Sequence, residues 1–298
     1  MIDSIRKYKL HKSKKSRRFS SIINLRRFHN WIKRTIIKET VETLKNTYNI
    51  KDITLLDLAV GRGGDIRKWH DNGIYNAVGI DIDDKSINGD QGAKERYNKL
   101  VNKMKKMNMP VPKYNFYVYD LSDPDNINHI DYHLKDKKFN IVSCQFAIHY
   151  FFRDEESLDT LLKIISMYID KHGFFIGTTM DGSKVNQMFM SGNIIDKKLY
   201  YLENKTNLED SVSLYGNKYI ASLGEKEGET HYFVDKPSEE YMVDIQELTR
   251  MCKKYNLRFI GTKHFEKWYE IYTKHNKYLS EEEKEFSFLN FSYVFYAN

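Results

Sequence analysis

The stretch of residues 53–65, ITLLDLAVGRGGD, constrains the fold most, because a short apolar run ends there in a glycine-rich loop. The run over its first eight residues is rich in branched side chains and bounded by turn formers, so it predicts a buried parallel strand. Gly61, Gly63 and Gly64 let the backbone turn tightly and approach a ligand closely. We expect Asp65 to cap the next helix, which indicates a strand–loop–helix unit with a pocket at the loop.

Acidic residues surround this loop. Asp57 lies inside the first strand, and Asp81 ends the second predicted strand, NAVGID, 20 residues after Gly61. At this distance a nucleoside-binding βαβ unit places an acid against ribose hydroxyls. The loop lacks the third glycine of a dinucleotide fingerprint, so diphosphate binding is not favoured. S-adenosylmethionine fits better, since its sulfonium and ammonium groups suit carboxylates, although a bare glycine turn alone is common.

Further apolar runs extend the alternation of strands and helices. Residues 114–120 predict a third strand that ends in Asp120, after a helix at about 84–108; residues 139–146 predict a fourth strand that runs into His149. A helix from 154 that Gly173 ends and a strand at 174–180 follow. The pattern predicts an α/β fold with a doubly wound, Rossmann-like parallel sheet, whose strand ends share one crevice. The sequence pattern leaves open whether His149 packs in the core or faces the crevice.

The alternation stops after Met180. Residues 181–239 are polar, glycine-punctuated and tyrosine-rich, with strand-like pieces, and we interpret them as an inserted lid or small β element that covers a substrate. A final helix–strand pair and residues 290–298 return to the sheet. We therefore divide the chain into a basic arm at 1–25 and one domain at 26–298.

Composition excludes several classes of protein. The 298 residues are 41% hydrophobic, enough to bury a core, and no apolar stretch is long enough to span a membrane. Two distant cysteines indicate neither a disulfide framework nor a zinc set, so we expect no metal. Net charge is +7, and residues 1–34 hold twelve Lys or Arg against one acid, which favours a polyanionic partner over a merely solvated arm.

With these pieces placed, the chain resembles the messenger RNA cap guanine-N7 methyltransferases from about residue 17 to 295. The matching motifs occur in the family's order: LRRFHNWIK at 25–33, LLDLAVGRGGDIRKW at 55–69, SCQFAIHY at 143–150, FFIGTT at 174–179 and EYMV at 240–243. Departures are Ala59, Val60 and Arg62 for the usual Gly, Cys and Lys, His29 for an Asn, and Met180 for a Pro. The resemblance implies a class I methyltransferase sheet.

The resemblance also implies roles in binding S-adenosylmethionine, whose product would be S-adenosylhomocysteine. Lys33 would pair with the methionine carboxylate, although periodicity alone makes it an ordinary charge on an amphipathic helix at 26–48. Asp57, Gly61 and Asp65 would hold the loop and the amino end, and Asp81 would accept both ribose hydroxyls. The residues beside the adenine would be Asp120, Leu121, Ser122 and Gln145.

On the substrate side, the resemblance implies that Glu240 accepts from N1 and the exocyclic amine of guanine; spacing alone would make it a helix-terminal acid. No residue would act as acid or base, because guanine N7 has a free lone pair, so His149, Tyr150 and Glu240 would act by placement. The other residues implied at the cap are His29, Asn30, Arg62, Arg96, Phe146 and Tyr293, with Ser292 as an alternative to the last.

Two other functions remain open from the sequence. One is methyl transfer to another RNA position or a small molecule, and the other is cap binding without activity. The implied partner is 5′-capped mRNA. Triphosphatase or guanylyltransferase domains, or a stimulatory subunit, are further possible partners, and we expect no membrane binding. A viral enzyme, which is often one domain of a larger capping protein, would act in the cytoplasm, and a cellular one in the nucleus.

Overall fold

The computed structural model describes residues 21–206, 213–224, 226–227, 230–231, 238–274, 276 and 278–298. Most of the basic arm assigned to residues 1–25 lies outside these residues. The described part of the arm leads directly into helix α2 (Ile23–Tyr48), which begins inside the range assigned to the arm. The division of the chain into arm and domain stays a prediction.

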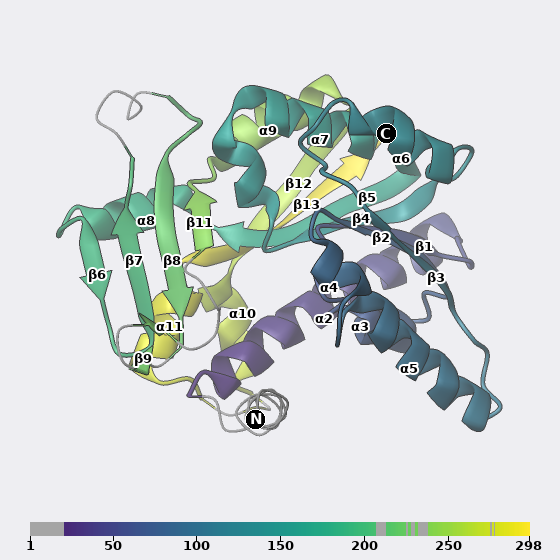
Figure 1. Cartoon of the computed structure of the whole chain (residues 1–298), viewed down its shortest axis with the longest axis horizontal. Coiled ribbons are helices and arrows are strands. Elements are labelled where there is room, and N and C mark those ends of the chain that lie inside the picture. The colour runs from purple at the N-terminus through teal and green to yellow at the C-terminus, as the bar shows by residue number, and fades with distance from the viewer. Residues whose placement is uncertain are drawn as a thin grey trace, which may run out of the picture.

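A seven-stranded sheet organises the fold, with strand order β12-β13-β5-β4-β1-β2-β3 (Figure 1). Its strands are β1 (Thr54–Leu58), β2 (Asn76–Asp81), β3 (Lys113–Val118), β4 (Phe139–Gln145), β5 (Ile169–Met180), β12 (Leu257–His264) and β13 (Asn290–Ala297). The five adjacent strands β5, β4, β1, β2 and β3 are parallel to one another. Strand β13 runs antiparallel to both of its neighbours, β5 and β12. The predicted α/β fold with a doubly wound parallel sheet is confirmed, with one antiparallel strand near its edge.

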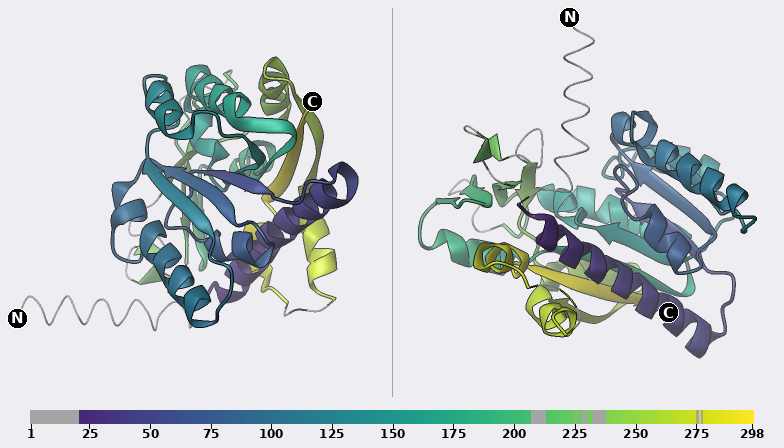
Figure 2. Two further views of the ribbon diagram at one scale, coloured as in Figure 1. Left: turned by 90° about the vertical axis from the view of Figure 1, so that its right-hand side faces the viewer. Right: turned by 90° about the horizontal axis from the view of Figure 1, so that it is seen from below.

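Helices cover both faces of this sheet (Figures 1 and 2). One face carries α6 (Asn126–Leu134), α7 (Glu155–Tyr168) and α9 (Ile245–Lys254). The other carries α2, α3 (Ile66–Asp71), α4 (Asp84–Asn88), α5 (Ala93–Lys106) and α10 (Phe265–Tyr272). Each layer encloses its own apolar core, one around Leu161 and Phe175 and the other around Ile32 and Trp69.

Local sequence explains why the first strand and α2 form. Leu55, Leu56 and Leu58 are fully buried, as expected for a strand with helices on both faces. In α2 the buried side chains recur every three or four residues, so one stripe packs on the sheet while charges face outward. Asn49 adopts the left-handed conformation that ends this helix, and its N–H bonds the carbonyl of Leu44.

Several predicted boundaries were wrong. The helix expected at 84–108 divides into α4 and α5, because Gly89 and Gly92 are extended and interrupt its hydrogen bonds. The helix expected to reach Gly173 ends at Tyr168, because Ile169 already pairs with Phe139 in the sheet. Asp65 precedes α3, but its side chain makes no capping hydrogen bond, because lysine ammonium groups bind it instead.

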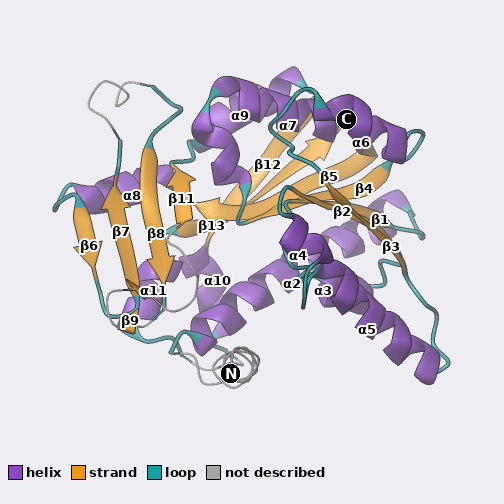
Figure 3. Ribbon diagram, in the orientation of Figure 1, coloured by secondary structure: helices purple, strands orange, loops and turns teal. Residues whose placement is uncertain are grey.

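A second, four-stranded sheet stands beside one end of the main sheet (Figure 3), in the order β11-β8-β7-β6. Its strands are β6 (Ile194–Asp196), β7 (Tyr200–Asn204), β8 (Lys218–Leu223) and β11 (Ser238–Tyr241); α8 (Gly182–Phe189), α11 (Glu281–Ser287) and the short pair β9 (Lys226–Glu227) and β10 (Thr230–His231) accompany them. The strand-like pieces predicted in residues 211–223 and 230–235 extend partly outside the described residues. Within the described part of the chain, no helix has the length and apolar character needed to cross a membrane.

Candidate functional site

The glycine loop and the ends of β1 and β2 form the first part of the site. The N–H of Gly61 donates to Oδ2 of Asp81 at 2.7 Å, and the N–H of Asp83 donates to Oδ1 at 2.9 Å. Asp81 is 9% exposed, and burial raises its pKa against these two hydrogen bonds. The structure thus fixes the Asp81 carboxylate beside the loop, with further acceptor positions on both oxygens.

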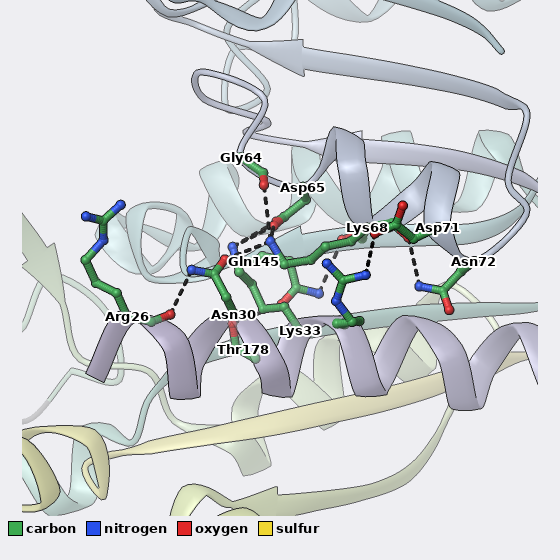
Figure 4. A network of polar contacts seen from close by, with 12 residues as sticks. Arg26, Asn30, Lys33, Gly64, Asp65, Lys68, Asp71, Asn72, Gln145 and Thr178 are labelled. Carbon is green, nitrogen blue, oxygen red and sulfur yellow. Dashed lines mark hydrogen bonds and ion pairs between the residues drawn. The ribbon is translucent and has the colours of Figure 1, made fainter. Parts of the chain in front are cut away.

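A buried ion-pair network connects this loop to α2 (Figure 4). Lys33 reaches Asp65 at 2.9 Å, and Lys68 reaches the same carboxylate at 2.6 Å. Lys68 also donates to the side-chain oxygen of Asn30 at 2.7 Å and to the carbonyl of Gly64 at 3.1 Å. All three donors of this ammonium are therefore used, although it sits at a 4% exposed position.

Two buried carboxylates respond in opposite directions to this environment. Burial raises the pKa of Asp57 well above its usual value, and the nearby charge of Asp65 raises it further against a hydrogen bond from Ser143. Burial would also raise the pKa of Asp65, but Lys33 and Lys68 outweigh it and hold that pKa well below normal. Asp65 is therefore the fixed negative charge of the pair, and Asp57 is the carboxylate that holds a proton more readily.

The neighbouring strand ends supply polar groups and an apolar wall. Asp120 follows β3 and accepts from the N–H and hydroxyl of Ser122 at 2.8 and 2.7 Å, while Leu121 between them is buried. Gln145 ends β4, where its carbonyl accepts from Thr178 at 3.0 Å and its amide donates to Ser143 at 3.3 Å. Asp81 and Gln145 thus end β2 and β4, and Asp120 follows β3, so all three lie at the carboxyl ends of parallel strands.

Phe146 marks the transition to the second part of the site. It has a positive φ of 55°, rare for an aromatic residue, and its N–H donates to the carbonyl of Thr178 at 2.8 Å. The turn brings its ring against His29, with centroids 5.3 Å apart and planes within 14°. The ammonium of Lys33 lies 5.8 Å from the Phe146 ring centroid. Strain at Phe146 thus places an aromatic face between the ion-pair network and α2.

His29 is held as a neutral ring. Its Nε2 lies 2.8 Å from the hydroxyl of Ser287, and burial, followed by the charge of Lys33, lowers its pKa to about 3. Asn30, the next residue, is exposed but donates to the carbonyl of Arg26 at 2.7 Å as well as accepting from Lys68. His29, which replaces the family's usual Asn, is thus an uncharged aromatic ring.

His149 and Glu240 approach each other from elements that are far apart in the sequence. His149 lies in the 3-10 helix η1 (Ile148–Arg153), and its Nε2 is 3.9 Å from Oε2 of Glu240 in β11. This separation is too long for a hydrogen bond, and His149 Nε2 is buried without a partner among the described residues. Burial lowers the pKa of His149 although Glu240 opposes the shift. A neutral imidazole therefore faces a carboxylate.

Glu240 and Tyr150 are themselves anchored by the small sheet. The buried hydroxyl of Tyr219 in β8 donates to Oε2 of Glu240 at 2.8 Å, and Tyr219 also contacts the sulfur of Met180 at 3.5 Å. The hydroxyl of Tyr150 lies 3.1 Å from that of Ser238, and Tyr150 is 45% exposed. The second sheet therefore holds Glu240 and Tyr150, two of the residues that the resemblance implies at the cap.

Two arginines flank the loop between α4 and α5. Arg62 is exposed and reaches the carbonyl of Asp90 at 3.4 Å, and Arg96 donates to the carbonyl of Gln91 at 3.0 Å. The N-terminal end of α5 packs against the glycine loop, since a Cβ on Gly63 would lie 3.1 Å from the Cα of Ala93. Arg62 and Arg96 thus both lie beside the loop that joins α4 to α5.

Tyr293 lies apart from these residues. Its ring is fully buried with Phe175 and Phe291, and its hydroxyl donates to the carbonyl of Cys144 at 3.1 Å. Ser292 points to the opposite face of the sheet, where it accepts from the indole of Trp268 at 3.0 Å. Neither residue is brought beside His149 or Glu240 by a contact, and a role at the cap stays a prediction for both.

Three supporting residues were missed by sequence reasoning. Lys68 completes the network around Asp65, Ser143 supports Asp57, and Tyr219 orients Glu240. The spacing of Lys68, three residues after Asp65 on a helix, was the available signal. No signal of this kind existed for Ser143 or Tyr219, because strand pairing and the second sheet bring them into place.

Comparison with known proteins agrees with this geometry. The family model described as the mRNA (guanine-N(7))-methyltransferase domain matches residues 5–287. Proteins named mRNA cap guanine-N(7) methyltransferase match from Caenorhabditis briggsae, with 34% identity over 70% of this chain and 54% of its own length, and from Schizosaccharomyces pombe, with 29% identity over 84% and 64%. The chain spans about half the length of the curated relatives it matches.

Among solved structures, an S-adenosylmethionine-dependent methyltransferase from Clostridium acetobutylicum shares the fold. It has a TM-score of 0.54 and 17% identity, and the match covers 88% of this chain and 90% of that one. The Rossmann-like methyltransferase sheet predicted from the sequence is therefore confirmed. The family match covers most of the chain, including the glycine loop, His149 and Glu240. The chain belongs to the mRNA (guanine-N(7))-methyltransferase domain family.

Proposed function

We propose that this chain transfers a methyl group from S-adenosylmethionine to N7 of the guanine in the 5′ cap of mRNA. The observation that carries the proposal is the approach of His149 to Glu240, 3.9 Å apart, in a chain that also holds the buried acids Asp57, Asp65 and Asp81 at the strand ends and the glycine loop. The acids and the glycine loop suit the cofactor, and the carboxylate with its neutral imidazole suits a guanine. Family membership supports both assignments.

The residues at the glycine loop fit S-adenosylmethionine. Asp81 uses one acceptor position of each oxygen on a backbone N–H, which leaves both oxygens able to accept ribose hydroxyls. A Cβ at Gly61 or Gly64 would meet no atom within 4 Å, so the backbone there is open to close approach by a ligand. When bound, the cofactor would supply an electrophilic methyl group on a positively charged sulfur.

The ion-pair network suits the amino-acid end of the cofactor. Two ammonium groups, Lys33 and Lys68, share the single carboxylate of Asp65, so the network carries surplus positive charge toward the methionine carboxylate. Lys33 is the ammonium assigned to that carboxylate, because all donors of Lys68 are already used. Asp57 would face the cofactor's ammonium group. Beside the adenine we place Asp120, Leu121, Ser122 and Gln145.

Glu240 would select guanine. A carboxylate can accept from N1–H and the exocyclic amine of guanine together, a pairing that adenine cannot offer. Tyr219 holds the carboxylate in place. His149 would contact the base through the ring nitrogen that has no partner among the described residues. Guanine N7 has a free lone pair, so alignment with the methyl group is the enzyme's main contribution, and the lowered pKa of His149 accords with a residue that does not act as a base.

The remaining cap residues would frame the base and its triphosphate bridge. Tyr150 and Phe146 present aromatic faces, each worth about 1–3 kcal/mol when a base stacks on it. Arg62 and Arg96 would contact phosphate oxygens. His29 and Asn30 of α2 would border the triphosphate bridge. The buried Tyr293 would act indirectly, by supporting the end of β4 through its hydrogen bond to the carbonyl of Cys144.

The proposed partner is capped mRNA. Triphosphatase and guanylyltransferase domains, or a stimulatory subunit, would act with the chain if they accompany it in the cell. A cellular enzyme would work in the nucleus, where capping accompanies transcription, and a viral one in a cytoplasmic factory. These assignments follow from the proposed reaction.

The test is methyl transfer from labelled S-adenosylmethionine to GpppA- and GpppG-capped RNA. Digestion of the product should release 7-methylguanosine. Asp81→Ala and Glu240→Ala should each lower kcat/KM by about a hundredfold, because each removes two hydrogen bonds to a charged group. Asp84→Ala and Glu239→Ala are matched controls, since these exposed acids lie close in sequence to Asp81 and Glu240. A wild type that binds cofactor and leaves the cap unmethylated would refute the proposal.

A further inference from the structure

Helix α5 is strongly basic. Its 14 residues, AKERYNKLVNKMKK, contain six Lys or Arg and one acid, Glu95. Four of these cations, Arg96, Lys99, Lys103 and Lys106, are spaced by three, four and three residues, so they lie along one side of the helix. We call this set the α5 stripe. It extends about 15 Å along the helix axis at 1.5 Å per residue.

The rest of the helix explains why the stripe faces outward. Ala93 and Met104 are buried, and Tyr97 and Leu100 pack against the core that includes Trp69. Lys99, Lys103 and Lys106 are exposed. Lys99 pairs with Glu95 on the same helix, whereas no carboxylate among the described residues forms an ion pair with Lys103 or Lys106. The stripe therefore presents net positive charge to solvent.

The stripe begins at the candidate site. Its first member, Arg96, binds the carbonyl of Gln91, and Arg62 of the glycine loop binds the adjacent carbonyl of Asp90. Figure 1 shows α5 running from beside α4 to the rim of the molecule, away from the second sheet. The stripe therefore continues, without a change of sign, the two arginines assigned to the triphosphate bridge.

We propose that the α5 stripe binds the phosphates of the RNA chain that follows the cap. This inference rests on the proposed function, because Arg62 and Arg96 fix where the RNA would leave the cap site. Basic side chains in a row attract a single-stranded polyanion without sequence preference, and each phosphate contact adds to the salt dependence of binding. If these side chains only kept the helix solvated, the affinity for capped RNA would not depend on the length of the RNA.

The experiment compares two substrates and two triple variants. Lys99→Gln/Lys103→Gln/Lys106→Gln removes three charges of the stripe, and Lys135→Gln/Lys163→Gln/Lys171→Gln removes three exposed charges from the surface around α6 and α7. The substrates are the GpppA dinucleotide and a capped RNA of some 20 nucleotides. KM and kcat are measured for both, and affinity for fluorescent capped RNA is measured by anisotropy at several salt concentrations.

For the stripe variant, KM for capped RNA should rise roughly tenfold or more at low salt, and its log–log salt slope should fall by about 2, or 0.7 for each lost contact. KM for the dinucleotide should stay within twofold of wild type, which also shows that the variant is folded. Equal effects in the two triple variants, or an unchanged salt slope, would overturn the proposal. Because anisotropy needs no turnover, it still tests the stripe if the chain fails to methylate the cap, a result that would instead refute the proposed function.

Discussion

The residues that we propose for the cofactor (the cofactor side) and those that we propose for the cap (the cap side) are held in place in different ways. On the cofactor side, Asp65 has two lysine partners, and Lys68 uses every donor it has. On the cap side, Glu240 accepts a hydrogen bond from Tyr219, and His149 Nε2 has no partner in the described part of the chain. The charged groups of the cofactor side are therefore paired with one another. The cap side keeps a polar atom, His149 Nε2, without a hydrogen-bond partner among the described residues.

The difference follows from how the chain supplies the two sides. Asp57, Asp65 and Asp81 all come from one continuous strand–loop–helix–strand segment, from β1 to β2. His149 and Glu240 come from η1 and from the second sheet, so their separation depends on how that sheet sits on the main one. We infer that cofactor affinity depends on charge pairing, whereas cap affinity depends on positioning by β8 and β11.

The largest predicted effect breaks the ion-pair network. Lys68→Met keeps the approximate length of the side chain but removes its charge, so the buried Asp65 and the exposed Asn30 each lose a partner. We expect the free energy of unfolding to fall by about 3 kcal/mol. Cofactor affinity should fall with it, because Lys33 would then be the one remaining ion-pair partner of Asp65 among the described residues. Urea unfolding and S-adenosylhomocysteine titration measure the two effects.

Arg34→Met is the control for this change. Arg34 also ties α2 to α3, through Asp71 at 2.6 Å, but the side chains are 44% and 34% exposed. Its loss should cost at most about 1 kcal/mol. Equal losses in the two variants would show that burial of the network does not matter.

The next effect concerns the cap side. Tyr219→Phe removes the hydroxyl that holds Glu240 while keeping the buried ring. KM for capped RNA should rise by about tenfold, the size expected for one hydrogen bond to a charged group, with KM for the cofactor unchanged. Tyr201→Phe makes the same change in the same small sheet, against Glu203 at 3.0 Å, and should leave both constants alone. A rise in cofactor KM with Tyr219→Phe would contradict the separation of the two sides.

His29 lies between the two sides and predicts a dependence of stability on pH. Burial and the charge of Lys33 lower its pKa to about 3, so between about pH 6.5 and 3 the unfolded chain binds a proton that the folded chain does not. Stability should therefore decline as pH falls through this range, by at most about 1.4 kcal/mol per pH unit from this residue. His29→Asn should remove that part of the slope in urea unfolding, whereas His129→Asn, at an exposed position, should not.

The smallest predicted effect is a gain. Ala59 adopts φ of 60°, a left-handed conformation that a residue with a Cβ resists and glycine accepts. Ala59→Gly should raise the free energy of unfolding by about 0.5–1 kcal/mol, since strain is removed from the glycine loop. Ala77→Gly in β2 is the control and should destabilise, because a buried methyl group is lost from an extended strand. Loss of stability with Ala59→Gly would mean that packing of the methyl group outweighs the strain.

Much of the cofactor side could be predicted from sequence because its information is local. Apolar runs and glycines in one segment specify a strand, a turn and a helix, and the acid at the end of β2 follows at a spacing that the fold imposes. The same reasoning could not tell that Asp65 gives up the capping role for lysines. That choice depends on α2, which lies next to the loop only in the folded chain.

The cap side was less accessible to sequence reasoning. Glu240 was selected by resemblance, but Tyr219 was not, because the pairing of β8 with β11 is a long-range contact. Tyr293 shows the converse. The resemblance implies a place at the cap, which stays a prediction, while the two-residue period of β13 directs the ring of Tyr293 into the core. Positive φ at Ala59 and Phe146 could not be inferred from residue types that normally avoid it.

The most direct test of the two-sided crevice is calorimetric titration of wild type, Asp81→Ala and Glu240→Ala with S-adenosylhomocysteine and, separately, with GpppA. The account predicts a crossed pattern. Asp81→Ala should lose cofactor-product affinity by about a hundredfold and keep GpppA affinity, and Glu240→Ala should do the reverse. If Glu240→Ala binds GpppA as wild type does, or if each variant loses both ligands equally, the assignment of the two sides is wrong.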